Sequence, residues 1–457
     1  MAQKASLPKG TRDFLPQDVL KRNYLFETLK HIFKQHGFSP IETPSFELSS
    51  TLMGKYGEEG DRLIFRILNS GDKMKKADLE ALAAENLPRF ANSLSEKALR
   101  YDLTVPFARF VVQHQNDISF PFKRYQIQPV WRADRPQKGR YQEFYQCDVD
   151  VVGSDSLLYE VDYVQIIDEA LSTLKIPSFN ILINNRKILS GIAEVTGQTE
   201  HLIDITVAID KLDKIGKDGV IAELKTKGIP DEAIAKITPL FDFATSLENE
   251  QAVAEMKSYL ASSETGKKGV EELEFVLEKT KELGLRNGIL KFDVTLARGL
   301  NYYTGAIFEV KVNGVEMGSI VGGGRYDDLT GLFGLKGVSG VGISFGAARI
   351  FDVLNELNLF PADLSKGIKL LFLNFGEKEA FHSLKLMQKL RKNAIDCDLY
   401  PEESKIQKQL KYANNIHAQF VAMVGEAEMQ KDVILLKNME SGEQTELKLD
   451  ELLLQLK

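Results

Sequence analysis

Residues 124–153, RYQIQPVWRADRPQKGRYQEFYQCDVDVVG, are the most informative stretch of this chain. The pattern is typical of two strands joined by a basic loop at 133–139. Side chains alternate between the faces of a strand, so the polar residues of both runs share one face. They are Arg124, Gln126, Gln128 and Arg132, followed by Arg140, Gln142, Gln146, Asp148 and Asp150, and the aromatic Phe144 lies on the same face. Such a face fits an anionic nucleotide beside a small cationic or polar ligand; a solvated sheet face is the alternative.

Length and composition indicate a globular protein of two or three domains, because 457 residues exceed what one hydrophobic core organises. Hydrophobic residues make up 43% and charged residues 27%, which is ordinary for such proteins. No apolar run approaches membrane-spanning length and the N-terminus lacks the core of a secretory signal, so we expect a cytoplasmic protein. Cys147 and Cys397 stand far apart without a Cys/His cluster, which argues against a disulfide framework or a structural zinc site.

Charge is distributed unevenly along the chain. The net charge of −7 argues against wholesale coating of nucleic acid, but not against a local basic footprint. Between Lys123 and Arg140 there are six basic residues and one carboxylate, Asp134. Near the C-terminus, three lysines fall toward one face of a predicted helix: Lys405, Lys408 and Lys411. They could contact a nucleic-acid backbone, and a merely solvated face is the alternative.

The order of helical and strand patterns suggests how the chain is organised. We expect a helix over 18–36, an extended stretch with Pro40 and Pro44, a helix over 155–174 and a buried strand over 179–185. Residues 186–284 are Lys/Glu-rich and helical. Strand patterns return at Leu290, with a strand over 306–312 and a turn at Asn313-Gly314. After Pro361, alternating strands and helices are typical of a compact α/β domain.

Six segments carry a resemblance to a known family. Residues 124–153 resemble motif 2 of the class II aminoacyl-tRNA synthetases, in the form found in the histidyl-tRNA synthetase family. The others are KGTRDFLP at 9–16, LRYDLTVPFARF at 99–110, LARGLNYYTG at 296–305, GGGRYDDL at 322–329 and GVGISFGAARI at 340–350, which resembles motif 3. RGLNYYTG is the most specific of them, because it is peculiar to the histidine enzymes within the class.

The resemblance implies a mixed α/β (α+β) fold with four segments. Residues 1–185 and 288–362 would form an antiparallel-sheet catalytic core, with motifs 1 and 2 in the first part and the histidine-specific motifs and motif 3 in the second. Residues 186–287 match the position of a helical insertion. A plain helical subdomain with solvated charges fits them equally well. Residues 366–457 match the position of an anticodon-binding domain, and Pro44 matches the motif 1 proline of the family's homodimer interface.

An ATP site is implied without a phosphate-binding loop. No G-x-x-x-x-G-K-[ST] sequence is present, and Gly340, Gly342 and Gly346 miss the dinucleotide spacing by one residue. Side chains must then neutralise the phosphates, which suits the planar fork of arginine. By resemblance, the ATP-binding residues are Arg132 at the α-phosphate, Arg140 toward the γ-phosphate, Phe144 beneath adenine and Arg349 on the other side. Arg298 and Arg132 would be the catalytic residues that bracket the α-phosphate, and both would contact histidine.

The resemblance also implies a set of histidine-binding residues. Asp102, Thr104 and Gln146 would bind the α-amino group, Asp150 and Tyr303 would hold the imidazole, and Tyr302 and Tyr326 would shape the pocket. From the residues alone, Thr104 could be only a helix cap, and the tyrosines could be core aromatics. Asn301 stands where the family usually carries Asp, which puts the orientation of the neighbouring tyrosines in question.

The implied reaction is that of a histidine–tRNA ligase. Histidine and ATP would give histidyl-adenylate and pyrophosphate, and the histidyl group would pass to the terminal ribose of tRNA(His). Mg²⁺ would serve the leaving pyrophosphate, and the sequence does not identify its ligands. The alternative is a non-catalytic regulatory subunit of histidine biosynthesis. It is disfavoured because Arg132, Arg140, Arg298 and Arg349 are all present and a C-terminal domain follows.

Overall fold

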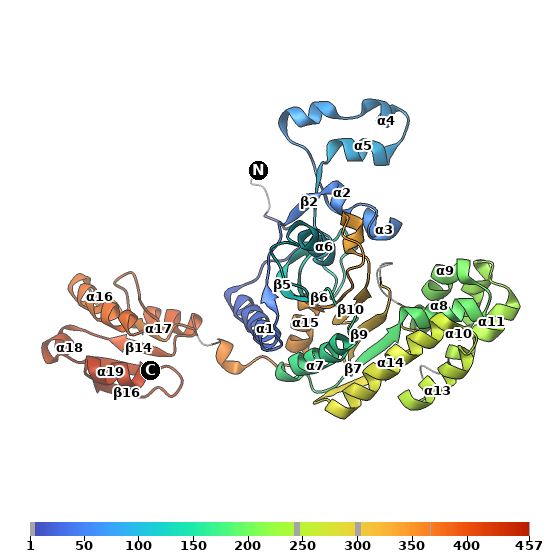
Figure 1. Ribbon diagram of the computed structural model, residues 1–457. Coiled ribbons are helices and arrows are strands. Elements are labelled where there is room, and N and C mark those ends of the chain that lie inside the picture. Colours follow the sequence, from blue (N-terminus) through green and yellow to red (C-terminus); the bar gives the residue numbers. More distant parts are fainter. Residues whose placement is uncertain (1–4, 242–246, 298–302, 366, 457) are drawn as a thin grey trace. The chain divides into compact units, whose positions relative to one another are not determined.

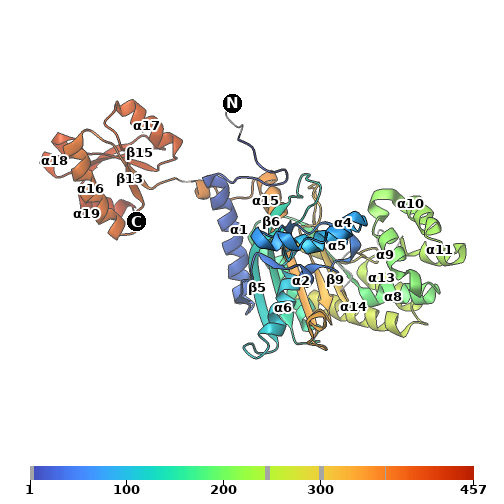
Figure 2. The same ribbon diagram turned by 90° about the horizontal axis from the view of Figure 1, so that it is seen from above.

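The computed structural model in Figures 1 and 2 describes residues 5–241, 247–297, 303–365 and 367–456. The chain divides into two compact units. The first comprises Met1–Phe14 and Lys21–Leu359, and the second comprises Leu15–Leu20 and Phe360–Lys457. No helix among the described residues is long and apolar enough to cross a membrane.

The first unit is built on an eight-stranded sheet in the order β1-β5-β6-β11-β10-β9-β7-β8. Every ladder from β5 to β7 is antiparallel, and the outermost pairs β1·β5 and β7·β8 are parallel. This arrangement confirms the predicted mixed fold with an antiparallel sheet. The strands are β1 (Ser39–Pro40), β5 (Phe122–Trp131), β6 (Glu143–Val152), β7 (Phe179–Asn185), β8 (Gly288–Phe292), β9 (Ala306–Val312), β10 (Val321–Tyr326) and β11 (Gly340–Gly346).

The β5–β6 pair holds the predicted polar face in register. Arg124 lies opposite Asp150, Gln126 opposite Asp148, and Gln128 opposite Gln146. The alternative of a solvated face is wrong, since Arg124 and Gln126 are fully buried and Asp148 is only 2% exposed. The second strand begins later than the alternation suggests, at Glu143, so Arg140 and Gln142 belong to the connecting loop.

Helices cover the two sheet faces differently. Helix α1 (Pro16–Gln35) packs against the apolar face, where the ring of Phe33 lies 5.8 Å from Tyr125 and 5.6 Å from Phe345. Helix α7 (Leu158–Thr173) covers the same face, since Tyr163 contacts Phe38 and donates to the carbonyl of Val341. Helix α15 (Ala347–Glu356) follows β11 directly. The polar face is therefore left for α6 (Thr104–Gln113) and a cavity.

Two residues that the sequence singled out, Pro44 and Thr104, lie next to or at the start of regular elements. Pro44 lies in the irregular segment between β1 and β2, not in a strand, and its carbonyl accepts a hydrogen bond from Arg100. Thr104 is not the cap of α6: it is the first helical residue, and the side chain of Asp102 accepts from the backbone N–H of Val105 instead. The hydroxyl of Thr104 is thus not required for capping.

Two smaller elements complete the first unit. The first is a three-stranded sheet, β2 (Phe46–Leu48), β4 (Lys97–Leu99) and β3 (Arg66–Ile67), with α2 (Ser49–Leu52), α3 (Gly57–Arg62), η1 (Gly71–Lys76), α4 (Leu79–Ala83), α5 (Leu87–Leu94) and η3 (Thr330–Phe333). The second is the helical segment α8 (Arg186–Val195), η2 (Thr199–His201), α9 (Leu202–Ile209), α10 (Leu212–Thr226), α11 (Asp231–Ile237), α13 (Asn249–Tyr259) and α14 (Glu264–Leu283). Its helical character agrees with the Lys/Glu-rich pattern of the sequence.

The second unit has its own five-stranded mixed sheet in the order β13-β12-β14-β15-β16. A core that includes Phe372, Met387, Leu390 and Leu436 packs the helices onto it. The strands are β12 (Leu370–Phe372), β13 (Cys397–Leu399), β14 (Phe420–Met423), β15 (Ile434–Asn438) and β16 (Gln444–Leu447). The helices are η4 (Ala362–Ser365), α16 (Glu377–Lys392), α17 (Ile406–Asn415), α18 (Glu426–Lys431) and α19 (Leu449–Leu456).

Candidate active site

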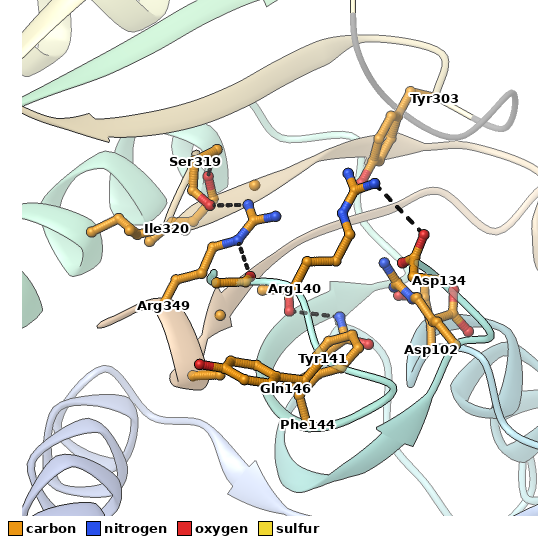
Figure 3. Close-up of a pocket in the computed structure, with 18 residues that line it drawn as sticks. Asp102, Asp134, Arg140, Tyr141, Phe144, Gln146, Tyr303, Ser319, Ile320 and Arg349 are labelled. Atoms are coloured by element: carbon orange, nitrogen blue, oxygen red, sulfur yellow. Dashed lines mark hydrogen bonds and ion pairs between the residues drawn. The ribbon is translucent and has the colours of Figure 1, made fainter. Parts of the chain in front are cut away.

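A cavity of about 310 Å³ lies over the polar sheet face (Figure 3). Its walls come from the start of α6, the loop between β5 and β6, the strands β6, β10 and β11, and the first turn of α15. Eight of the residues proposed from the sequence line it: Asp102, Thr104, Arg132, Arg140, Phe144, Gln146, Tyr303 and Arg349. Segments far apart in sequence therefore meet in one pocket.

Cationic side chains line one end of the cavity. The guanidinium of Arg349 is oriented by the carbonyls of Gly139, at 2.9 Å, and Ser319, at 2.5 Å (Figure 3). Arg140 is about half exposed and lies 3.7 Å from the carboxylate of Asp134. Gly139 has φ +71°, and a Cβ there would approach the Met317 sulfur to 2.7 Å, so the close fold of this loop requires glycine. This end suits an extended anion.

Arg132 lines the cavity, and its charge acts on the buried Asp102. Its Nε donates to the carbonyl of Tyr101 at 3.1 Å, and its guanidinium carbon lies 4.3 Å from the ring centre of Tyr101 and 5.3 Å from that of Phe144. One hydrogen bond and two aromatic faces thus fix the side chain. A guanidinium held in this way is preorganised to stabilise charge on a phosphate.

The buried end begins with a fixed carboxylate. Asp102 is 2% exposed, and its Oδ1 accepts from the Tyr56 hydroxyl at 2.8 Å and from the Val105 amide at 3.2 Å. Burial raises the pKa of Asp102, while Tyr56 and the charge of Arg132 oppose that shift. Among the described residues, Oδ2 of Asp102 and Oε1 of Gln146 have no hydrogen-bond partner. Two acceptors are therefore available to a ligand that brings its own N–H donors.

Asp150 and Tyr326 lie beneath the cavity wall. The Tyr326 hydroxyl donates to Oδ1 of Asp150 at 2.7 Å, and Asp150 is 3% exposed. A Cβ on Gly342 would come within 1.9 Å of the Asp150 carboxylate, and one on Gly324 within 2.9 Å of the Tyr303 ring. Glycines therefore provide the space in which these two predicted imidazole-binding residues stand. Burial also raises the pKa of Asp150, and Arg124 opposes this.

Part of the predicted site lies outside the described residues, namely Arg298, Asn301 and Tyr302. Conversely, Tyr56, Arg124, Asp148 and Ser344 contact the site and were not assigned to it from the sequence. Arg124 and Asp148 could have been found from their place on the polar face. No sequence signal singled out Tyr56, whereas Ser344 lies in the motif 3 segment, on the strand face that it shares with Gly340, Gly342 and Gly346.

Comparisons with known proteins agree with this geometry. The family model described as histidyl-tRNA synthetase matches residues 10–76 and 85–350, and that described as anticodon binding domain matches 371–457. A curated histidine–tRNA ligase of Christiangramia forsetii is 59% identical over 452 residues, covering 98% of both chains. One of Bacteroides fragilis is 58% identical over 453 residues, covering 99% of both.

Solved structures show the same relationship. The crystal structure of histidyl-tRNA synthetase from Nostoc sp. PCC 7120 aligns with a TM-score of 0.82 and 31% identity over 100% of this chain and 99% of that one. A Bacillus halodurans structure titled as an ATP phosphoribosyltransferase regulatory subunit/histidyl-tRNA synthetase shares the fold, with a TM-score of 0.72 at 20% identity over 93% of this chain and 99% of that one. Full-length likeness to the curated ligases, together with the assembled motif residues, places this chain in the histidyl-tRNA synthetase family.

Proposed function

We propose that this protein is a histidine–tRNA ligase, which activates L-histidine with ATP and then transfers the histidyl group to the 3′-terminal ribose of tRNA(His). The observation that carries the proposal is the lining of the cavity, which combines the arginines Arg132, Arg140 and Arg349 with buried acceptors on Asp102 and Gln146. ATP fits the arginines through its phosphates, and histidine fits the buried polar groups through its ammonium and imidazole groups. The two reacting groups would meet at Arg132.

The first step follows from that placement. An oxygen of the histidine carboxylate attacks the α-phosphorus, a new O–P bond forms, and the bond to the pyrophosphate oxygen breaks. No proton needs to move, so catalysis rests on orientation and on cations at the equatorial oxygens. Arg132 supplies one such cation, and we assign the second to Arg298. Phe144 would stack beneath adenine, with Arg140 and Arg349 at the outer phosphates.

Histidine recognition is assigned to groups at the buried end. Asp102, Thr104 and Gln146 would bind the ammonium, and Asp150 with Tyr303 would hold the imidazole, helped by Tyr302 and Tyr326. A site of buried polar partners rejects amino acids that leave those partners unpaired. Selectivity for histidine therefore needs no separate editing site.

Mg²⁺ is proposed to accompany ATP. It prefers oxygen ligands, keeps several waters and binds through substrate phosphates with only one or two carboxylates. The described residues hold no cluster of three or more metal-ligating side chains, while Asp134 beside Arg140 offers a carboxylate at the cationic end. That donor set fits an ion carried mainly by ATP. When bound, the ion would neutralise the charge that develops on pyrophosphate.

The remaining assignments concern the whole protein. We propose that residues 366–457 bind the tRNA anticodon, that 186–287 form the helical insertion, and that 1–185 and 288–362 form the catalytic core. Lys405, Lys408 and Lys411 are exposed, as a backbone contact would require, although Lys408 also lies 3.9 Å from Glu402. A homodimer is proposed because Pro44 matches the motif 1 proline of the family's dimer interface, and a cytoplasmic location because the family acts in translation.

ATP–pyrophosphate exchange, measured with each amino acid in turn, tests the proposal. Exchange should occur with histidine only, because Asp150 and Tyr303 together demand a side chain with hydrogen-bonding nitrogens at both ends. Comparable exchange with glutamine or tyrosine would contradict the assignment. A folded protein without exchange for any amino acid would favour the regulatory subunit, which the four motif arginines and the matched anticodon domain disfavour.

A further inference from the structure

A fully buried arginine stands directly behind the proposed imidazole site. Arg124 has no exposed surface, and its Nη2 lies 2.9 Å from Oδ2 of Asp150 and 4.0 Å from Oδ2 of Asp148. Its guanidinium carbon lies 4.3 Å from the ring centre of Phe107 on α6. Oδ1 of Asp150 accepts from Tyr326, and Oδ2 forms the ion pair with Arg124 but has no hydrogen-bond partner among the described residues. The carboxylate is therefore held in one orientation.

Asp148 links this arrangement to the other end of the histidine site. Gln146, Asp148 and Asp150 follow one another on the same face of β6, and β11 places Ser344 opposite Asp148. The Ser344 hydroxyl accepts from Nε2 of Gln146 at 2.8 Å, and Ser344 faces Asp148 across the ladder and lowers the pKa of its carboxyl group. A continuous polar path thus runs from Gln146, which lines the cavity, to Asp150 beneath it.

Stability alone is a poor explanation for these buried charged groups. Two carboxylates around one guanidinium are costly to bury, and a well-packed apolar cluster of the same volume is often as stable or more stable. The costs are incompletely offset, because Nε and Nη1 of Arg124 and Oδ1 of Asp148 have no hydrogen-bond partner among the described residues. Burial raises the pKa of Asp148 to about 7, and the charge of Arg124 opposes that shift. What the arrangement does provide is a fixed spacing between Gln146 and Asp150.

We infer that Arg124, Asp148 and Ser344 are positioning residues that set the distance and orientation between the two histidine-recognition groups, Gln146 and Asp150. The inference rests on the proposed histidine site and deepens it. Arg124 and Asp148 are not among the residues that line the cavity, and Ser344 lines it beside Gln146, to which it is hydrogen-bonded. They act by holding Gln146 at the ammonium end and Asp150 at the imidazole end through one shared support. Removing one of these contacts should loosen both Gln146 and Asp150 and weaken histidine binding, while the residues that bind ATP keep their positions.

The test compares Asp148→Asn, Ser344→Ala and the double variant by ATP–pyrophosphate exchange, with separate KM values for histidine and ATP. Asp148→Asn keeps the shape of the side chain and removes the negative charge, which lies next to Arg124 and Ser344. We expect a histidine KM raised about tenfold or more and an ATP KM within about twofold of the parent, as for loss of a charge-assisted hydrogen bond. The histidine KM of the double variant should rise by less than the product of the two single increases, because both substitutions disrupt the same set of contacts.

Asp168→Asn is the matched control. Asp168 is 2% exposed and accepts from the amides of Arg286, Asn287 and Gly288, away from the cavity. This variant should lower the melting temperature without changing the ratio of the two KM values. If Asp148→Asn behaves in the same way, the buried charges are structural and the inference is wrong. A parallel rise in both KM values would equally overturn it.

Asp150→Ala separates the inference from the site on which it rests. If this variant raises the histidine KM while Asp148→Asn and Ser344→Ala do not, the histidine site stands and the positioning role fails. If Asp150→Ala leaves the histidine KM unchanged, the assigned imidazole site is wrong and the inference fails with it.

Discussion

The Tyr56 hydroxyl donates a 2.8 Å hydrogen bond to Oδ1 of Asp102 inside the protein, and the two side chains come from different elements. Tyr56 precedes α3, whereas Asp102 precedes α6. The ring of Tyr56 also lies 4.6 Å from that of Tyr101. A residue outside the recognised motifs thus holds the carboxylate that we assign to the histidine ammonium.

Tyr56→Phe should raise the histidine KM on the order of tenfold, the effect of losing one hydrogen bond to a charged group. Burial raises the pKa of Asp102 and the Tyr56 hydroxyl lowers it, so its loss should raise the pKa further. The acidic limb of the kcat/KM profile for histidine should then move to higher pH. Tyr163→Phe, which removes a buried hydroxyl bonded to the Val341 carbonyl, is the matched control. An unchanged acidic limb in Tyr56→Phe would contradict the prediction.

Arg298→Ala should lower the adenylation rate on the order of 10²–10³-fold, more than it weakens ATP or histidine binding. The contact assigned to it strengthens as charge develops on the α-phosphate, so it binds the transition state preferentially. Arg298→Lys should restore the rate only partly, because a point charge cannot replace a planar fork. Pre-steady-state adenylate formation at saturating substrates measures this, with circular dichroism as the folding control. A near-normal adenylation rate together with greatly raised dissociation constants for ATP and histidine would mean that Arg298 contributes to ground-state binding only.

Removal of the chain after Pro361 should leave a protein that forms adenylate but charges tRNA poorly. The motif residues precede this point, and the following segment has its own sheet and core. Exchange and tRNA charging are measured on the same preparation, with the oligomeric state checked by sedimentation. Full-rate charging by a truncated protein of unchanged oligomeric state would mean that this segment does not bind the anticodon.

His36 should make stability depend on pH. Its Nδ1 lies 2.7 Å from Asp162 and its Nε2 3.0 Å from Glu169, and the hydrogen bond to Asp162 is the main reason that its pKa is raised above 6.5. A raised folded-state pKa stabilises the fold fully below pH 6.5, and this contribution is lost as pH rises through the folded value. The melting temperature of His36→Gln should therefore fall below the parent at pH 6 and approach it in alkaline buffer. His31→Gln, an exposed position on α1, is the control.

Local pattern accounts for much of the fold. The strands at Phe179–Asn185 and Ala306–Val312 have the predicted bounds, and the two strands of the motif 2 stretch pair so that Arg124 faces Asp150. Such features follow from alternation and turn residues within a few positions of each other. The alternative that Thr104 is only a helix cap is wrong, because Leu103 is the N-cap of α6 and the Asp102 side chain accepts from the Val105 amide.

The sequence alone determined the family, the antiparallel core and most of the residues that line the cavity, because short motifs keep their residue types and spacing. The tertiary structure decided which other side chains contact or face the site residues. Tyr56 donates to Asp102, and Arg124 and Ser344 are neighbours of the Asp148 carboxylate. The tertiary structure also decided that the polar face is buried and not solvated. Burial and side-chain contact arise only when α6, β5, β6 and β11 pack together, and periodicity within one strand carries no information about what covers it.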